Sequence, residues 1–399
     1  MRFSPEDEEF RGRIAEWLAA NVPAELRGAG GPGREHEAFA ERLAWNKRLA
    51  AAGLTCLGWP KEYGGHDATL VQQIIFYEEY ARSRAPARVA VVGEELLGPT
   101  LIAYGTPEQK RRFLPPVAAV EELWCQGYSE PGAGSDLAAV ATRAVPDGDE
   151  WVINGQKVWT SLAHVADWCF VLARTEPGSR RSAGLSYLLV PMRQPGVTVR
   201  PIRQLTGTSE FNEVFFDDAR TALGNVVGEP GDGWRIAKAT LEFERGVGML
   251  GQQVGFRREF GELVEKARQT PGGTDPLLRD RFARAWIGLE VMRAYALDTL
   301  GEPPGTGVEA SVLKVLWSRW HQALGELAMD VQGAGSMVAQ SLVGASMEGA
   351  KDGEGGEDLD AWQRLFLFGR AETIYGGSDE IQRNIIATRA LGLPRQVRS

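Results

Sequence analysis

The hydrophobic period of the chain changes near residue 123, and no other feature constrains its fold as strongly. Before that point apolar residues recur at helical spacing: Phe10, Ile14 and Leu18 follow a capping sequence that begins at Ser4. After it come short apolar or alternating runs bounded by turn residues, which predict strands. These runs are residues 151–153, 168–173, 185–190, 197–202 and 213–216. Because no helical pattern separates them, an antiparallel barrel or sandwich is favoured over a parallel sheet.

Helical periodicity returns near Gly233 and continues almost to the end of the chain. Long amphipathic segments cover residues 234–268, 276–300, 308–341 and 360–391, and four such segments predict a helical bundle. The expected fold class is therefore α+β, with three domains. They are an N-terminal α-helical domain over residues 1–122, an antiparallel β-barrel over 123–230 and a C-terminal four-helix bundle over 231–399.

Glycine and proline mark the expected breaks between elements. Thr106 caps a short helix that we expect to end near the prolines at 115–116. Asp-Gly at 147–148 and Asn-Gly at 154–155 are sequences typical of hairpin turns. Residues 352–360 are acidic and rich in glycine, so we expect a mobile loop before the penultimate helix.

The 399 residues carry a net charge of −9 and include only three cysteines and four histidines. An acidic chain is a poor match for nucleic acid or an anionic membrane surface. Neither the cysteines nor the histidines have the spacing of a disulfide framework or a metal site, so no metal is expected. No run approaches the ~18 apolar residues of a membrane span. Residues 1–20 lack a secretory signal, and we expect a cytoplasmic protein.

Three short motifs match catalytic or nucleotide-binding patterns but stand in the wrong context. Two G-x-G-x-x-G runs, which begin at Gly28 and Gly246, lack the strand that must precede a dinucleotide-binding loop. Ser311 and Lys314 have the spacing of a nucleophile pair but lie within a helical pattern without partner motifs. We therefore interpret all three motifs as structural.

Two motifs at the start of the β region favour a planar cofactor. Residues 128–136 read Y-S-E-P-G-A-G-S-D, a loop rich in hydroxyl groups and unhindered backbone. Residues 154–161 read N-G-Q-K-V-W-T-S and place Trp159 beside the hydroxyls of Thr160 and Ser161 at a strand end. A large aromatic ring with adjacent hydrogen-bonding groups suits a flat heteroaromatic cofactor. The alternative is a buried tryptophan with a structural role.

A third motif lies near the C-terminus, within residues 370–393. Gly376 and Gly377 interrupt an amphipathic pattern there, and Ser378 or Asp379 can cap the helical segment that follows. A turn of this kind leaves backbone N–H groups free to bind a ligand above it.

Together the three motifs resemble those of the acyl-CoA dehydrogenase family. Its members have a T/S-E-P-x-A-G-S-D loop, an N-G-x-K-x-W-I-T strand and a Tyr-Glu-Gly-Thr turn in this order, and the similarity covers nearly the whole chain. The resemblance implies FAD between barrel and bundle, and an acyl-CoA substrate. The implied FAD-binding residues are Tyr128, Ser129, Ser135, Trp159, Thr160, Ser161, Ser378 and Glu380. The implied substrate-binding residues are Ser135, Arg245 and Gly376.

The C-terminal turn departs from the family pattern because Gly376 stands where a catalytic glutamate is often found. Gly376 keeps the N–H group that would hold the thioester carbonyl but has no carboxylate. In a subset that includes isovaleryl- and long-chain-type enzymes, the base precedes an arginine on the first bundle helix. Glu244, which precedes Arg245, is the implied base. On a helix it shares a face with Ala237 and Leu241, a setting that should raise its pKa. The alternative is an ordinary ion pair.

The resemblance implies an FAD-dependent enzyme that converts an acyl-CoA to the trans-2-enoyl-CoA and passes electrons to an electron-transferring flavoprotein. It also implies a homo-oligomer, dimer or tetramer, while a mixed oligomer is open because Gly376 lacks the carboxylate of the family pattern. Residues 268–272 match the family's FAD-diphosphate segment only in part, so the residues that bind the diphosphate are undefined. Two alternatives are a flavin-dependent oxidase or monooxygenase of the same fold and a non-catalytic partner subunit. The acyl group is undefined, although Gly246 and Gly248 beside Glu244 favour a long or bulky chain, and an acyl carrier protein thioester could replace CoA.

Overall fold

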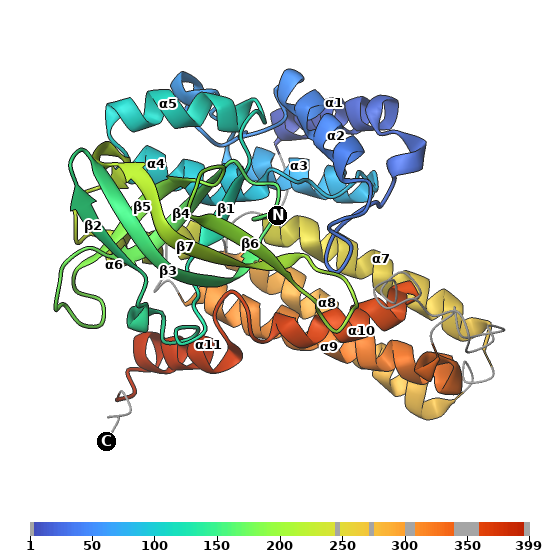
Figure 1. The fold of residues 1–399 in the computed structure, drawn as a ribbon. Helices are drawn as coiled ribbons and strands as arrows, with labels where there is room; N and C mark the ends of the chain where they lie inside the picture. Colours follow the sequence, from blue (N-terminus) through green and yellow to red (C-terminus); the bar gives the residue numbers. More distant parts are fainter. Residues whose placement is uncertain (1–3, 244–247, 271–274, 300–307, 339–358, 395–399) are drawn as a thin grey trace, which may run out of the picture.

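The computed structural model describes residues 4–243, 248–270, 275–299, 308–338 and 359–394. In Figure 1 the N-terminal helices (blue) lie above the β-strands (green), and the long C-terminal helices (yellow to red) extend to the lower right. The order of helices, strands and helices along the chain agrees with the change of period in the sequence.

Residues 4–121 are mainly helical. The α-helices are α1 (Pro5–Asn21), α2 (Phe39–Ala51), α3 (Leu70–Arg82), α4 (Gly98–Tyr104) and α5 (Pro107–Ala118). A complete capping box begins α1, α3 and α5, so that side chains satisfy N–H groups of the first turn. The prediction that α5 ends near residues 115–116 is wrong, since the helix continues to Ala118. Each proline removes only its own N–H donor, which a final turn tolerates.

An eight-stranded mixed sheet follows. Its strands are β1 (Trp124–Gly127), β2 (Arg143–Asp147), β3 (Glu150–Ser161), β4 (Trp168–Arg174), β5 (Leu185–Pro191), β6 (Val197–Ile202), β7 (Phe211–Ala222) and β8 (Val226–Val227). The order is β6-β7-β3-β2-β4-β5-β8, with β1 beside β4. Most strand pairs are antiparallel, as expected. The exceptions are β1, which pairs with β4 in parallel, and β2, which forms one parallel residue pair with β4. β1 enters the sheet directly from the helical region, and its parallel neighbour β4 follows in the chain only after the β2–β3 hairpin.

Of the two predicted hairpin turns, only the first is a turn. Asp147 and Glu150 pair across the β2–β3 hairpin, and Gly148 has a φ of +65°. Asn154 and Gly155 instead lie within β3, where the pairing with β7 shifts register. A Cβ on Gly155 would lie 2.7 Å from the Cα of Thr142. The glycine therefore permits a close backbone approach at a bulge.

The C-terminal region is built around one central helix. Its helices are α6 (Gly233–Phe243), α7 (Gly248–Arg268), α8 (Pro276–Thr299), α9 (Glu309–Gln332), α10 (Ala361–Glu372) and α11 (Asp379–Ile385). α9 contacts α7, α8, α10 and α11. Its buried face carries Trp317 and Leu324, which pack in one core with Phe256 of α7 and Met292 of α8. Most of the predicted mobile segment lies outside the described residues, although Asp360 caps α10.

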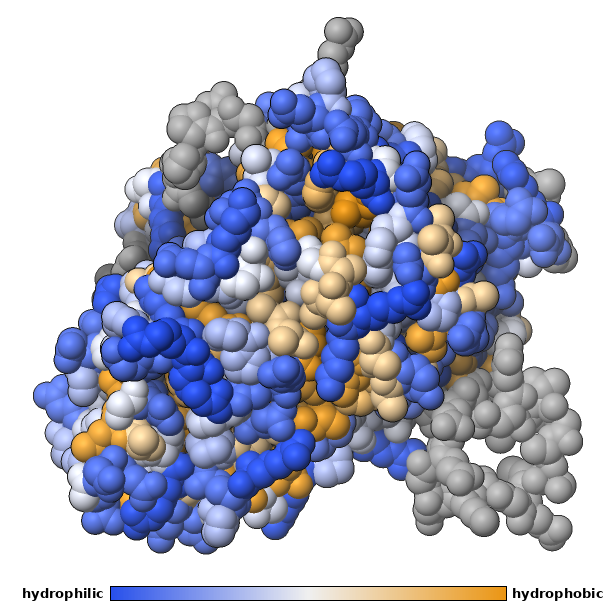
Figure 2. Space-filling view, turned by 90° about the horizontal axis from the view of Figure 1, so that it is seen from above, coloured by the Kyte–Doolittle hydropathy of each residue, from blue (hydrophilic) through white to orange (hydrophobic). Residues whose placement is uncertain are grey.

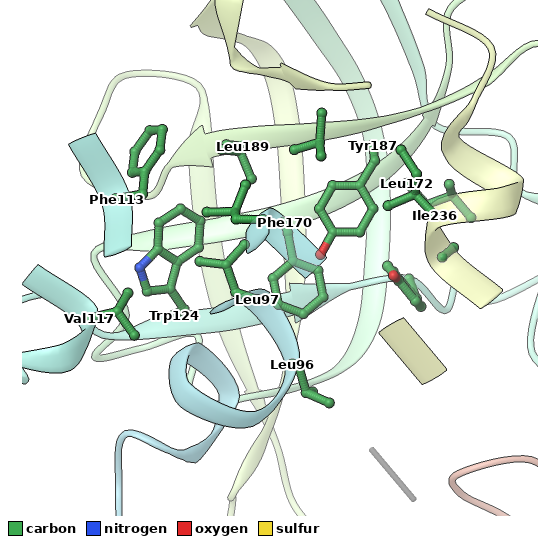
Figure 3. Packing of buried hydrophobic residues seen from close by; sticks show 14 of the residues in the cluster. Leu96, Leu97, Phe113, Val117, Trp124, Phe170, Leu172, Tyr187, Leu189 and Ile236 are labelled. Atoms are coloured by element: carbon green, nitrogen blue, oxygen red, sulfur yellow. The ribbon is translucent and has the colours of Figure 1, made fainter. Parts of the chain in front are cut away.

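A single aromatic core joins one face of the sheet to helices of the N-terminal and C-terminal regions. Trp124 of β1 stacks on Trp168 of β4, with ring centroids 5.6 Å apart. Phe170 and Tyr187 stack in the same cluster at 5.4 Å. Figure 3 shows side chains of α5 and α6 entering this cluster, among them Ile236. Because each buried side chain of this size contributes about 1.5–3 kcal/mol, the cluster holds the helices firmly to the sheet.

The first G-x-G-x-x-G run lies between α1 and α2, as its context predicted, and has a structural role. Gly28, Gly30 and Gly33 all have positive φ angles. A Cβ on Gly30 would meet the guanidinium of Arg42, which is fully buried. The carbonyl of Gly33 accepts a hydrogen bond of 3.1 Å from Nη1 of Arg364 on α10. The run therefore ties the N-terminal region to the last third of the chain.

The outer face above the N-terminal helices is shown in Figure 2. Hydrophilic residues cover most of this face, and apolar residues form interrupted patches near its centre. Among the helices of the described ranges, none combines the length and the apolar character that crossing a bilayer requires.

Candidate active site

A buried ion pair fixes the loop that follows β1. Lys157 Nζ lies 2.7 Å from Oε1 of Glu130 and donates to the backbone carbonyls of Tyr128 and Leu172 at 3.1 and 2.8 Å. The Glu130 carboxylate also accepts bonds from the N–H groups of residues 141–142. Burial by itself would raise the pKa of Glu130, but the Lys157 ammonium and these N–H groups hold it below its ordinary value. The buried ion pair between Lys157 and Glu130 therefore fixes the loop after β1 from the interior of the protein.

The same contacts join the first two sequence motifs. The N–H group of Val158 donates to the carbonyl of Ser129 at 2.9 Å, next to the Lys157 bonds. Ser129 is half-buried and Ser135 is exposed, so both hydroxyls lie at or near the surface of the loop. Tyr128 is buried, and its ring meets Phe170 edge-on in the aromatic core at 5.7 Å. Its side chain therefore supports the loop from the interior.

A bulge in β3 turns Trp159 outward. The residue has a φ of +61°, and the pairing of β3 with β7 shifts register between Lys157 and Thr160. As a result 57% of Trp159 is exposed, with its ring edge-on to Phe211 at 6.2 Å. Thr160 points inward and is buried, and its carbonyl accepts a bond from the side chain of Asn212 at 3.0 Å. The bulge offers a flat aromatic ring at the surface of the sheet.

The C-terminal motif forms the expected turn between α10 and α11. Gly376 and Gly377 have φ angles of +62° and +84°, which glycine adopts without strain. Ser378 caps α11 by accepting a hydrogen bond of 3.4 Å from the N–H group of Ile381. Nε2 of Gln382 donates to the carbonyls of both glycines, at 2.9 and 3.1 Å. These bonds fix the orientation of the peptide planes in the turn.

The N–H groups of residues 376–378 donate no hydrogen bond to any other part of the chain that the structure describes. The far end of the turn is fixed by Asp379, whose buried carboxylate accepts bonds from Ser318 Oγ at 3.2 Å and Arg319 Nε at 2.6 Å. Three successive donors are therefore held in place with no hydrogen-bond partner among residues 4–243, 248–270, 275–299, 308–338 and 359–394. Such a turn can bind an oxyanion or a carbonyl oxygen.

The predicted base and its neighbour, Glu244 and Arg245, lie outside the described residues. The adjoining helix α6 ends at Phe243. One turn before Glu244, the buried hydroxyl of Thr240 is 2.8 Å from that of Thr100 on α4. The role and the raised pKa of Glu244 stay predictions.

The remaining predicted residues lie at the surface. Glu380 is exposed in the first turn of α11, where its own backbone N–H and the Ser378 hydroxyl lower its pKa. Ser161, at the end of β3, is partly exposed. Arg268, the best match to the family's diphosphate-binding arginine, forms an exposed ion pair of 3.2 Å with Glu265.

Sequence reasoning missed two buried charged groups that shape the site. Lys157 belongs to the motif at residues 154–161, and strand alternation predicts that it lies on the same face of the sheet as Trp159. The bulge reverses that alternation. His321 was dismissed for lack of ligand spacing, yet both of its nitrogens face carboxylates within α7 and α10. The signal available in the sequence was the helical spacing of His321 with Trp317, Leu324 and Ala328 on the buried face of α9.

The arrangement fits a planar cofactor. More than half of Trp159 is exposed, two residues before Ser161, and the turn at 376–378 offers N–H donors that have no partner within the described residues. Helices, a sheet bearing an exposed aromatic platform, and a helical bundle in this order match the arrangement expected of a flavoprotein oxidoreductase.

The comparisons with known proteins specify which flavoprotein family this is. The N-terminal, middle and C-terminal domain models of acyl-CoA dehydrogenase match residues 4–121, 125–219 and 231–391. The chain belongs to the acyl-CoA dehydrogenase family, whose members use FAD. It is 63% identical to acyl-CoA dehydrogenase IpdE1 of Mycobacterium tuberculosis over 398 residues, which cover 98% of this chain and 99% of that one. IpdE1 of Mycolicibacterium smegmatis is 60% identical, with the same coverage.

Solved structures agree with this assignment. The Tcur3481-Tcur3483 steroid ACAD is 30% identical with a TM-score of 0.83, covering 99% of both chains. The ChsE4-ChsE5 complex from Mycobacterium tuberculosis is 31% identical with a TM-score of 0.81, covering 99% of this chain and all of that one. The expected fold class, family and cofactor are therefore confirmed.

Proposed function

We propose that the chain removes hydrogen from Cα and Cβ of an acyl-CoA, forming the trans-2-enoyl-CoA, and that an electron-transferring flavoprotein accepts the electrons. The turn at residues 376–378 is the observation that carries this proposal. Loss of the α-proton moves negative charge onto the thioester oxygen, and fixed N–H donors stabilise that charge. The Gly376 N–H is the donor that the family pattern assigns to the carbonyl, and it is free of competing bonds within the described residues.

FAD supplies the acceptor for the β-hydrogen when it is bound. Trp159 and Ser161 would flank its ring system, with Thr160 between them in the strand. The bonds of Lys157 and Glu130 would keep this strand and the Ser129 loop in register.

Glu244 is our candidate for the base that removes the α-proton. The turn carries glycine at 376, so it offers no carboxylate of its own. Glu244 follows α6 directly, and of the residues on its predicted face Ala237 is fully buried and Leu241 is partly buried against the aromatic core. A carboxylate that emerges from such a face is poorly solvated, which raises its pKa and strengthens it as a base.

We propose a bulky, ring-containing acyl group as the substrate. A solved relative that matches 99% of this chain is named a steroid ACAD, and the chain shares its fold over the same length. Gly246 and Gly248, close to Glu244 in sequence, would leave room for such a group. Each additional apolar group in a pocket is worth about 1–3 kcal/mol of discrimination.

A panel of acyl-CoA thioesters tests the proposed reaction and substrate. We expect steroid-derived acyl-CoAs to bleach the bound flavin anaerobically at least about tenfold faster than butyryl-CoA, because short chains leave the pocket unfilled. The measurement is the absorbance of oxidised flavin in a stopped-flow spectrophotometer. Bleaching by short straight chains alone would contradict the substrate proposal. Rapid peroxide formation in air would favour the oxidase alternative.

We also propose that the chain works in a mixed oligomer. Two solved relatives are named as pairs of different chains, and Arg268 offers only a partial match for binding the FAD diphosphate. The chain produced alone should therefore hold less than one FAD per protomer, and co-production with a second acyl-CoA dehydrogenase chain should raise this ratio. Light scattering and the flavin-to-protein ratio measure both effects. Full occupancy in the isolated chain would rule the proposal out.

A further inference from the structure

His321 lies in a buried cluster that joins three helices of the bundle. Its Nδ1 is 2.7 Å from Oε1 of Glu372 on α10, and its Nε2 is 3.0 Å from Oε2 of Glu259 on α7. The ring packs against Phe256, with centroids 4.4 Å apart, and is parallel to Trp320, whose centroid is 6.2 Å away. Because carboxylates accept hydrogen bonds, both ring nitrogens must carry hydrogen here. The cluster is therefore built for an imidazolium cation.

The charge of His321 is maintained over a wide pH range. Burial lowers the pKa of the imidazolium, but the hydrogen bonds that it donates to Glu259 and Glu372 outweigh burial and raise this pKa to about 10. Lys314 is a second cation close to Glu372, and its ammonium donates to the backbone carbonyl of that residue. Without the imidazolium, two carboxylates would face each other across a buried site.

Glu372 is the last residue of α10, immediately before the turn that holds Gly376. Its carboxylate is held by His321 and its carbonyl by Lys314, both from α9. The next residue, Thr373, accepts a bond of 3.1 Å from Gln322 of the same helix. At the other end of the turn, α9 holds Asp379 through Ser318 and Arg319. One helix therefore grips the turn on both sides.

We propose that His321 is a positioning residue for the turn at 376–378, acting through the carboxylate of Glu372. Besides Glu372 on α10, His321 binds Glu259 on α7, so it links the end of α10 to a third helix. The inference rests on the proposed function in one respect, namely that the turn holds the thioester carbonyl. The mechanical part of the inference concerns the turn alone. His321 sets where α10 ends, and the end of α10 sets where the free N–H groups point.

The mechanical part is tested by amide hydrogen exchange of the FAD-loaded protein. In His321→Gln, amides within 373–379 should exchange about tenfold faster, because the side chain that replaces the imidazolium is neutral and binds at most one carboxylate. Glu259→Gln keeps the bond between His321 and Glu372, and should leave these amides close to wild type. Unchanged exchange in His321→Gln would overturn the inference, whatever the reaction of the enzyme proves to be.

The catalytic part is tested by the rate at which an acyl-CoA with no transferable β-hydrogen, such as a 3-thia-acyl-CoA, exchanges its α-protons with D₂O. A misplaced carbonyl donor should slow this exchange by about ten- to hundredfold in His321→Gln, with less change in the dissociation constant. Arg281→Gln is the matched control, since it breaks an exposed ion pair with Asp330 between α8 and α9, away from the turn. Equal exchange rates in His321→Gln and wild type would sink the inference. The proposed function is judged separately, on wild type alone.

The dependence of thermal stability on the protonation of His321 gives a further test. The pKa of His321 in the folded protein, about 10, exceeds its ordinary value, so its contribution to stability is complete below about pH 6.5 and is lost as pH rises through about 10. The difference in thermal midpoint between wild type and His321→Gln should therefore narrow from pH 7 to pH 10.5, while Arg281→Gln shows no such narrowing. A constant difference over that range would show that His321 is not held as a cation.

Discussion

Replacing Glu244 with glutamine is expected to slow anaerobic flavin reduction by acyl-CoA about 10²–10⁴-fold, because the α-proton loses its base. The dissociation constant of the acyl-CoA should change little, since glutamine preserves the size of the side chain. Stopped-flow bleaching gives the rate, and titration with the enoyl-CoA product gives the affinity.

The matched control is Glu242→Gln, which alters an exposed carboxylate two residues earlier on α6. This variant should reduce flavin at the wild-type rate. If Glu244→Gln also retained the wild-type rate, the base would have to come from another element, and the relation between Gly376 and Glu244 would be wrong.

Replacing Lys157 with methionine is expected to destabilise the folded protein by about 3–5 kcal/mol, because the carboxylate of Glu130 stays buried without its cation. The Ser129 loop and the strand bearing Trp159 lose their shared anchor, so the variant should also lose FAD more readily. Chemical unfolding gives the free energy, and the flavin-to-protein ratio after gel filtration gives the retention.

The control is the double variant Lys157→Met with Glu130→Gln, in which no charge is left unpaired. Its stability should recover by more than half, since a buried ion pair can be replaced by neutral groups at little cost. If the double variant were as unstable as Lys157→Met, the loss would come from packing around the methionine and not from the buried charge.

Much of the fold was predictable because local rules dominate it. The capping sequences at Ser4 and Thr106 begin helices in the structure, and the apolar and alternating runs after residue 123 form strands. The parallel pairing of β1 with β4 was not predictable, because it depends on where the chain enters the sheet. The sequence of the four residues of β1 does not indicate whether this strand pairs in parallel or antiparallel.

The site was predictable in part for the same reason. The turn at Gly376 and Gly377 follows from glycine and a capping serine, which are local signals. The orientation of Trp159 does not follow from local signals, because a residue with a φ of +61° breaks the alternation of side chains on which strand predictions depend. The burial of Lys157 depends on partners from β1 and β4. His321 was missed because its carboxylates lie 62 and 51 residues away along the chain.

The bond from Arg364 to the carbonyl of Gly33 spans 331 residues of sequence. During synthesis, the loop at Gly33 leaves the ribosome long before α10 exists. The hydrogen bond between Gly33 and Arg364 can therefore form only when nearly the whole polypeptide has been made. This link between the N-terminal region and α10 is completed only after translation has passed the helix that leads into the Gly376 turn.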